Sequence, residues 1–273
     1  MAHPQIAVFA RLADGGARPV RKLEGQKTML GRTMHGISYD PANDEIFVPQ
    51  PFGQSILVFR GNADGEEAPI RVLQGPLTNI QNPDKVEVDP VHNEIFVPDD
   101  DKILVFARDA KGNTAPIRVL EGPDTMLGAD ALAVDPIHDR LIVTGWEGQR
   151  SDEKTFVLIF NRTDQGNVKP RGIIRGPKTQ LSRGTFSLRA YPPKGYILVA
   201  ISGPSWSGPY EDAAVGVWHI DDNGDVPPRW TIGGPRGMLK QPRGIDVDPK
   251  NKSIIISDKV VNAVLTYHFP EIF

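Results

Sequence analysis

A short apolar segment recurs along this chain at nearly constant spacing. ILVF at residues 56–59 returns as ILVF at 103–106, and weaker copies begin at Ile6, Val157, Val215 and Val264. The starts of successive copies are 50, 47, 54, 58 and 49 residues apart. Self-similarity at such a period predicts a protein built from one repeated supersecondary unit, whose copies bury their apolar faces against one another.

Each full repeat contains four short segments with β-sheet character. They consist of β-branched, aliphatic and aromatic residues and are bounded by Gly, Pro, Asn or Asp, which is typical of strands and tight turns. The chain has 27 glycines and 25 prolines in 273 residues, and no window shows a convincing helical period. Four-stranded units at this period predict an all-β fold, a single β-propeller. In the clearest repeat the segments are 85–89, 94–98, 102–106 and 116–122.

The number of blades follows from the first strand of each repeat, which in a propeller lies nearest the central channel. Five such strands predict five four-stranded blades in one domain over residues 1–273, with a degenerate sixth blade as the alternative. An extra pair of N-terminal segments, 6–9 and 19–25, is expected to close the last blade against the C-terminal strands, which would hide a sheet edge. The five first strands are predicted at 36–40, 85–89, 131–135, 187–191 and 244–248.

Three motifs of the repeat carry a family resemblance. RGIDVD at 243–248, EIFVP at 94–98 and ILVF at 103–106 match the pattern G-I-x-V-D, I-x-V, I-x-V-F, so the chain resembles the NHL-repeat propellers over nearly its whole length. That resemblance implies the fold but no single function, because such propellers include protein binders, RNA binders, lyases and hydrolases. The chain is also distantly similar to gluconolactonase-type propellers, which hold a divalent cation in the channel, but no motif here matches their ligands residue by residue.

Composition narrows the classes of partner. With 31 Lys and Arg against 34 Asp and Glu, the net charge of −3 argues against a nucleic-acid partner, which needs a concentrated positive field. The absence of cysteine excludes disulfides and cysteine-based metal sites. No segment approaches the roughly 20 apolar residues of a membrane span, so no membrane partner is expected. The N-terminus as given predicts a cytoplasmic protein, or a secreted or periplasmic one if a leader has been removed.

Two sets of equivalent positions are expected to line the channel at the top face, and their residues differ from blade to blade. A repeat selected for stability alone could use one residue type throughout, so this variety favours a functional site. The middle positions of the five first strands are Ser38, Glu87, Ala133, Arg189 and Asp246, and the positions just before those strands are His35, Asp84, Asp130, Phe186 and Arg243.

The charged members of these sets support two kinds of chemistry. The carboxylates Asp84, Glu87, Asp130 and Asp246 are candidate ligands of a divalent cation, Ca²⁺ or Zn²⁺. His35, Glu87 and Arg189 are candidate catalytic residues, with His35 as the base and the arginine stabilising a developing anion, and Arg243 is a candidate ligand-binding residue. The alternative is that these residues are hydrated channel lining, or pair with one another as internal ion pairs.

Two long loops between second and third strands give a further prediction. Residues 144–154 and 201–213 extend the third and fourth blades on the top face, where Trp146, Trp206 and Tyr210 would be ligand-binding anchors. The alternative is that these aromatic residues only cover the blade tops. The sequence thus predicts a propeller that binds a small molecule or a protein at the top face, with a metal-dependent hydrolase or lactonase as the alternative function.

Other motifs are predicted to be structural. The aspartates of the DP turns, including the turns that hold His92 and His138, are expected to cap those turns through their side chains. The arginines of the PIRVL segments, Arg71 and Arg118, are expected to protect sheet edges or to bridge blades. Residues 221–225, DDNGD, begin like a calcium loop but lack its later glycine and glutamate, so a hairpin turn is expected there.

Overall fold

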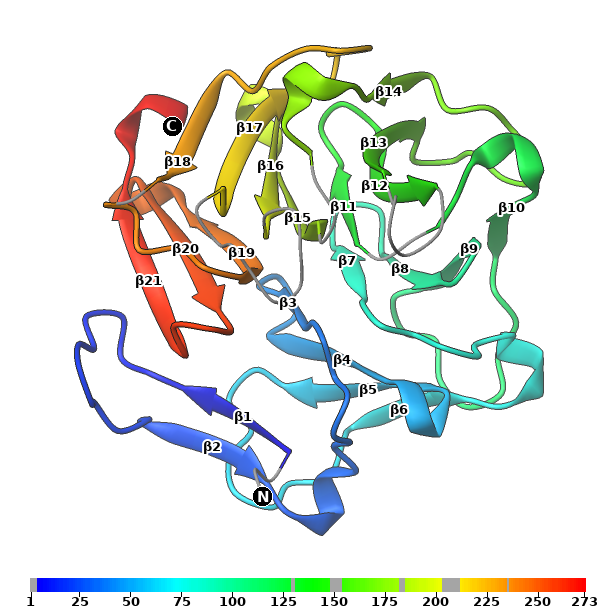
Figure 1. The fold of residues 1–273 in the computed structure, drawn as a ribbon. Helices are drawn as coiled ribbons and strands as arrows, with labels where there is room; N and C mark the ends of the chain where they lie inside the picture. The colour runs from blue at the N-terminus through cyan, green and yellow to red at the C-terminus, as the bar shows by residue number, and fades with distance from the viewer. Residues whose placement is uncertain (1–3, 129–130, 148–153, 182–184, 203–211, 235) are drawn as a thin grey trace. The chain divides into compact units, whose positions relative to one another are not determined.

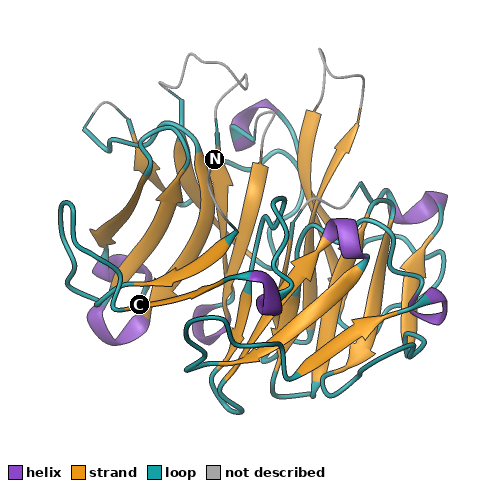
Figure 2. Ribbon diagram, turned by 90° about the horizontal axis from the view of Figure 1, so that it is seen from below, coloured by secondary structure: helices purple, strands orange, loops and turns teal. Residues whose placement is uncertain are grey.

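The computed structural model describes residues 4–128, 131–147, 154–181, 185–202, 212–234 and 236–273. They group into two compact units, Met1–Asp99 with Leu104–Arg118 and Asp100–Ile103 with Val119–Phe273. Within these described ranges every regular element is a β-strand or a short 3₁₀ turn, and none is an α-helix (Figures 1 and 2). No helix among them is long and apolar enough to cross a membrane.

The strands come in sheets whose order in space follows their order in the sequence. In the N-terminal part of the chain, a two-stranded antiparallel sheet precedes two four-stranded ones. The first sheet is β1 (Gln5–Val8) and β2 (Arg21–Glu24), the second is β3 (Ser38–Asp40), β4 (Glu45–Gln50), β5 (Ser55–Arg60) and β6 (Arg71–Gln74), and the third is β7 (Glu87–Asp89), β8 (Glu94–Asp99), β9 (Lys102–Ala107) and β10 (Arg118–Glu121).

The C-terminal part of the chain continues the same pattern with two four-stranded sheets and one of three strands (Figure 1). These are β11 (Leu132–Asp135), β12 (Arg140–Glu147), β13 (Lys154–Asn161) and β14 (Gly172–Ile174); β15 (Thr185–Tyr191), β16 (Tyr196–Ile201), β17 (Ala214–His219) and β18 (Trp230–Gly233); and β19 (Pro242–Asp248), β20 (Ser253–Asp258) and β21 (Ala263–His268).

This strand order confirms the predicted fold class, a five-bladed β-propeller. Each of the five predicted first strands is present, as β3, β7, β11, β15 and β19. The first two are shorter than predicted and begin at Ser38 and Glu87, while β15 and β19 begin earlier, at Thr185 and Pro242. Pairing of the N-terminal strands with the C-terminal ones and the single-domain organisation both stay predictions.

Apolar side chains of the repeated motif fill the space between neighbouring sheets. In the first unit Val48, Leu57 and Phe59 are buried together with Leu23. In the second unit Trp218 is fully buried, and its indole Nε1 donates a hydrogen bond to the carbonyl oxygen of Val226 at 3.2 Å. The same segments that recur in the sequence therefore form the cores, because alternate residues of a blade strand point to its two faces.

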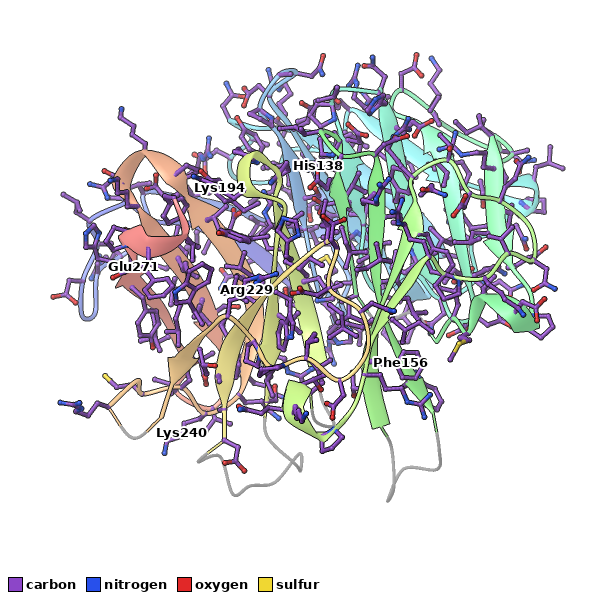
Figure 3. The ribbon with its side chains drawn as sticks, turned by 90° about the horizontal axis from the view of Figure 1, so that it is seen from above. His138, Phe156, Lys194, Arg229, Lys240 and Glu271 are labelled. Carbon is purple, nitrogen blue, oxygen red and sulfur yellow. The ribbon has the colours of Figure 1, made fainter. Side chains whose placement is uncertain are left out.

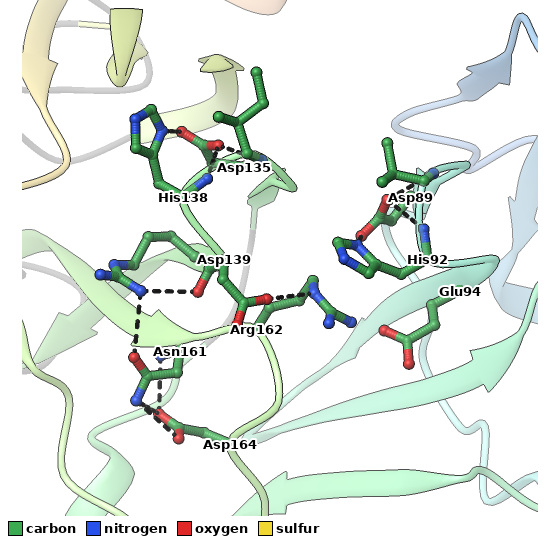
Figure 4. A network of polar contacts seen from close by, with 12 residues as sticks. Asp89, His92, Glu94, Asp135, His138, Asp139, Asn161, Arg162 and Asp164 are labelled. Carbon is green, nitrogen blue, oxygen red and sulfur yellow. Dashed lines mark hydrogen bonds and ion pairs between the residues drawn. The ribbon is translucent and has the colours of Figure 1, made fainter. Parts of the chain in front are cut away.

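The DP turns are closed by their aspartates, as predicted. One carboxylate oxygen of Asp135 accepts the backbone N–H groups of Ile137 and His138, and the other lies 2.9 Å from His138 Nδ1 (Figure 4). Asp89 makes the same contacts with Val91 and His92. Since these aspartates are buried, the hydrogen bonds satisfy carboxylates that would otherwise be costly to desolvate. In the turns after β3 and β19 an asparagine replaces the histidine, at Asn43 and Asn251.

A second repeated device joins the outer strands β2, β6, β10 and β14 to the following sheet, and we name it the blade clasp. A glycine in the turn before a fourth strand exchanges two backbone hydrogen bonds with the outer strand of the preceding sheet. For Gly112 the N–H donates to the Val72 carbonyl at 2.7 Å, and the carbonyl accepts from Gln74 N–H at 3.0 Å. The other clasp glycines are Gly65, Gly166 and Gly224, the last within the 221–225 segment, which forms the hairpin turn that was predicted.

Immediately after these four outer strands the chain turns at a glycine in a conformation that other residues rarely adopt. Gly122 has φ 118° and ψ 163° and begins a 3₁₀ turn, Pro123–Thr125. The buried hydroxyl of Thr125 donates to the Gly122 carbonyl at 2.6 Å and accepts the N–H of Leu127 at 3.3 Å. The same arrangement recurs at Gly25, Gly75 and Gly176.

Charged side chains are paired where they are buried in the first unit. The Glu45 carboxylate at the start of β4 accepts two hydrogen bonds from Arg71, at 2.6 and 2.8 Å, and one from Arg108 at 2.6 Å. This hydrogen-bonded pairing raises the pKa of the Arg71 guanidinium, while burial acts in the opposite direction. Arg71 also donates to the Arg108 carbonyl at 3.4 Å, so both arginines join this sheet to the segment that follows β9, and Arg71 bridges blades as predicted. Arg118 repeats the first contact with Glu94.

Candidate functional site

The candidate site is a cavity of about 500 Å³ in the first unit. Three loops build it: the one that leads into β3, the turn between β4 and β5, and the one that leads into β7. These are the kinds of loop that the sequence places on the top face of a propeller. The lining residues are Thr33, His35, Pro51, Phe52, Gln54, Gln81, Asn82 and Asp84.

Two predicted site residues meet in this cavity. His35 Nδ1 lies 3.0 Å from Asp84 Oδ1, and both side chains are partly exposed. A carboxylate beside Nδ1 favours the tautomer that carries its proton there, which leaves the lone pair of Nε2 free to accept a proton or a hydrogen bond. The ammonium of Lys85 donates to the His35 carbonyl at 3.1 Å and holds this backbone in place. The pair can therefore act as a hydrogen-bonding group or as a base.

Two further side chains give the cavity a mixed character. The hydroxyl oxygen of Thr33 is buried and has no hydrogen-bond partner among the described residues. Buried polar atoms are nearly always satisfied, so this hydroxyl is an exception. Because the oxygen is closed off from solvent, a molecule in the cavity would reach it only if neighbouring side chains moved. Phe52 is 77% exposed in the turn after β4 and presents an apolar ring to the same cavity.

The backbone around the cavity is held by side chains behind it. The buried carboxylate of Asp99, at the end of β8, accepts the N–H groups of Gln81, at 3.0 Å, and of Asn82. On the opposite loop the side-chain oxygen of Gln50 accepts the N–H of Gly53 at 2.9 Å. Loops fixed in this way lose little conformational freedom when a ligand binds, which favours affinity.

Four of the other predicted channel residues form two pairs. The Ser38 hydroxyl lies 3.4 Å from Glu87 Oε2 and accepts the N–H of Val88 at 3.1 Å. In the second unit Arg189 Nε lies 2.9 Å from Asp246 Oδ1. This contact is an internal ion pair of the kind weighed as the alternative to a catalytic role. Arg243 lies on β19, where the pairing with β20 is irregular between Pro242 and Gly244.

The proposed metal ligands are not brought together in the part of the chain that the structure describes. No group of three or more His, Asp or Glu side chains lies there at distances that could hold a metal ion. Asp84 has His35 as its partner, and Asp130 lies outside the described residues. The donor set for Ca²⁺ or Zn²⁺ therefore stays a prediction.

The loop predicted over residues 144–154 is shorter than expected. Its first four residues extend β12 and its last residue begins β13, because Trp146 pairs with Thr155 and Gly145 with Phe156. Phe156 (Figure 3) needs a glycine opposite it, since a side chain at Gly145 would overlap its ring. Trp146 is 45% exposed on this hairpin, and a Cβ atom added at Gly128 would lie 3.0 Å from its indole Nε1. Trp206 and Tyr210 lie outside the described residues.

Sequence reasoning found His35 and Asp84 but missed Thr33, Phe52 and the amide side chains beside them. The long loops of the third and fourth blades indicated a site there, whereas the turn after β4, which holds Phe52, is short. The available signal was Phe52 itself, since a large apolar residue inside the polar turn PQPFGQ has no place in a core.

Comparison with known proteins supports the fold alone. No protein-family model and no curated protein matches the sequence. Among solved structures, the crystal structure of a nidogen/laminin complex matches with 16% identity and a TM-score of 0.51, over 86% of this chain and 80% of that chain. Kuenenia stuttgartiensis hydrazine synthase matches with 14% identity and a TM-score of 0.55, over 91% of this chain and 67% of that one. The NHL-repeat assignment thus stays a resemblance.

Proposed function

We propose that this propeller is a ligand-binding protein, and that it holds a small molecule in the cavity beside His35 and Asp84. The observation that carries the proposal is a preformed cavity lined by an exposed aromatic ring, that of Phe52, and by the hydrogen-bonded pair of His35 and Asp84. Apolar contact area combined with a few fixed polar groups is the usual composition of a small-molecule site.

The proposed site lies at a different place from the one that the sequence favoured. The long loops of the third and fourth blades were expected to wall the site, and that expectation depends largely on residues outside the described ranges. The cavity at the first two blades combines two of the predicted residues with loops held in place by Asp99 and Gln50. A partner protein at the same face remains the second kind of ligand, since one fold neighbour is described as a complex.

The test is a fragment screen followed by NMR at the His35 imidazole, which His35→Gln assigns. Fragments that bind in the cavity should shift the His35 signals. Phe52→Ala should lower their affinity by at least about tenfold, because apolar contact is lost. His268→Gln, a change at an exposed histidine on β21, is the matched control and should leave binding unchanged. If no fragment shifts His35, or if binding survives Phe52→Ala and Asp84→Asn alike, the cavity is not a ligand site.

A metal-dependent hydrolase or lactonase is the second candidate, favoured by the pairing of His35 with Asp84. In that reaction His35 Nε2 would accept a proton from water, and Asp84 would stabilise the imidazolium that forms. A cation bound by the predicted carboxylates would polarise the ester carbonyl.

Thermal unfolding of chelator-treated protein with Ca²⁺, Mg²⁺, Mn²⁺ or Zn²⁺ separates this candidate from simple binding. A cation site should raise the stability by about 2.7 kcal/mol at a hundredfold excess over Kd. Asp84→Asn should abolish the shift, whereas Asp14→Asn, at an exposed loop carboxylate, should retain it. If none of the four cations raised the unfolding temperature, the metal-dependent reaction would be ruled out.

A further inference from the structure

A second cavity, of about 650 Å³, adjoins the first, and the two share Gln54 and Gln81 in their linings. We propose that the two cavities form one groove that binds a neutral oligosaccharide of at least two sugar rings. We name it the amide groove; its defining side chains are Phe52, Gln54, Gln74, Asn79, Gln81 and Asn82. The inference rests on the proposed ligand-binding function and assigns a chemical class to its ligand.

The chemistry of the second cavity is amide-rich and uncharged. Among the described residues that line it there is no Asp, Glu, Lys or Arg. A side-chain amide offers both N–H donors and a carbonyl acceptor, which matches a sugar hydroxyl that donates one hydrogen bond and accepts others. A charged group in the second cavity would be left uncompensated, and in the first cavity Asp84 already has His35 as its partner, so a neutral polyhydroxyl compound fits the groove best.

The amides are partly fixed and partly available. Gln74 Nε2 donates to the Gly53 carbonyl at 2.6 Å, and Gln54 Nε2 donates to the Gln81 carbonyl at 3.3 Å, which orients these two side chains. The side-chain amides of Asn79 and Gln81 make no hydrogen bond within the described ranges and are exposed. The groove thus presents hydrogen-bonding groups to solvent on a backbone that Asp99 holds from behind.

Phe52 supplies the other half of carbohydrate recognition. One face of a pyranose ring carries C–H groups and is apolar, so it packs against an aromatic ring while the hydroxyls at its edge reach polar side chains. Phe52 is 77% exposed, lines the first cavity and lies two residues before the shared Gln54. Covering it would remove a large apolar surface from water and would thereby favour binding.

Comparison with the equivalent positions of other repeats indicates that the amides are not required by the fold. The residue after the buried threonine has a left-handed conformation in four repeats, with φ 57° at Asn79, and this position is Met29, Met126 and Gln180 in the others. Asparagine is enriched in that conformation, so the backbone accounts for Asn79. The differences at positions 81 and 74 have no such backbone reason. Gln81 replaces the glycines Gly31 and Gly128, and Gln74 replaces the charged Glu24, Glu121 and Arg175.

The experiment is saturation-transfer NMR on the full chain with maltotriose, cellotriose and triacetylchitotriose at millimolar concentration. At least one trisaccharide should receive saturation, strongest at the C–H protons that face Phe52. Asn79→Ala and Gln81→Ala together should weaken its binding by about tenfold, since two hydrogen bonds are lost. Leu77→Ala, at an exposed apolar residue of the same loop that does not line either cavity, is the matched control and should bind as the wild type does.

Three results would overturn the inference: no transfer to any of the trisaccharides, binding that is unaffected by the double substitution, or binding of extended peptides without any saccharide. These outcomes are distinguishable from failure of the proposed function. Fragments that shift the His35 signals while no saccharide binds would leave a small-molecule site and remove its assignment to carbohydrates. Unchanged thermal midpoints of the variants would show that the loss is one of binding and not of folding.

Discussion

Glu45→Gln should lower the free energy of unfolding by about 3–5 kcal/mol, the range for removing one partner of a buried ion pair. The Glu45 side chain is 10% exposed, and its partners Arg71 and Arg108 are 17% and 16% exposed. The substitution leaves two guanidinium groups with little water and with a neutral amide in place of the carboxylate. Asp40 lies 3.8 Å from Arg108 Nε and compensates only part of that charge. Urea denaturation followed by circular dichroism measures the change.

The matched control for this prediction is Glu67→Gln in the same sheet region. Glu67 pairs with Arg60 at 2.7 Å, but the Arg60 side chain is 58% exposed. An exposed pair contributes at most about 1 kcal/mol, so this variant should be nearly as stable as the wild type. Replacing Glu45, Arg71 and Arg108 together by apolar residues should restore much of the stability, because no buried charge is then left without a partner. Equal effects of Glu45→Gln and Glu67→Gln would contradict the buried-pair interpretation.

Gly122→Ala should destabilise the protein by about 3 kcal/mol, the upper end of the strain expected for a side chain in this backbone region. At φ 118° and ψ 163° a Cβ atom is disfavoured by the residue's own backbone. It would also lie 2.6 Å from Oδ1 of Asn167, which accepts the N–H of Asp124 and fixes the turn. The measurement is the midpoint of urea unfolding together with its slope.

Gly16→Ala provides the comparison for that substitution. A Cβ at Gly16 meets no atom within 4 Å, and the residue lies outside the left-handed region. Its effect should stay within about 0.5 kcal/mol, as for most surface substitutions. If Gly122→Ala were as mild as Gly16→Ala, the turn after β10 would have room to relax, and its glycine would not be required for the fold.

Most of the fold could be predicted from the sequence, because the repeated residues form strands and turns through local interactions. The five first strands, the aspartate-capped DP turns and the hairpin at 221–225 all depend on contacts within a few residues. The blade clasp was not predicted, although its glycines were visible, because its hydrogen bonds join Gly112 to Val72 and Gln74, about 40 positions earlier in the chain. The pattern of residues in one sequence does not show which backbone groups form hydrogen bonds at such a distance along the chain.

The candidate site was predictable only where equivalent repeat positions converge. His35 and Asp84 occupy equivalent positions in successive blades. They are 49 residues apart in the sequence, and the repeat places His35 Nδ1 3.0 Å from Asp84 Oδ1. Phe52, Thr33 and the amides contribute through loop conformation, which depends on the buried Asp99 and on Gln50. Neither of those residues carries a motif, so the shape of the cavity could not be read from the sequence.

The blade clasp has a consequence for how such a chain can change over generations. Each clasp needs a glycine and the acceptor side chain that follows it, and its other partners are backbone groups of the preceding outer strand and turn. Both residues lie in one turn of the blade that carries them. A duplicated or recombined blade would therefore arrive with its own attachment already in place. Its loops could then diverge toward new ligands without weakening the joints that hold neighbouring sheets together.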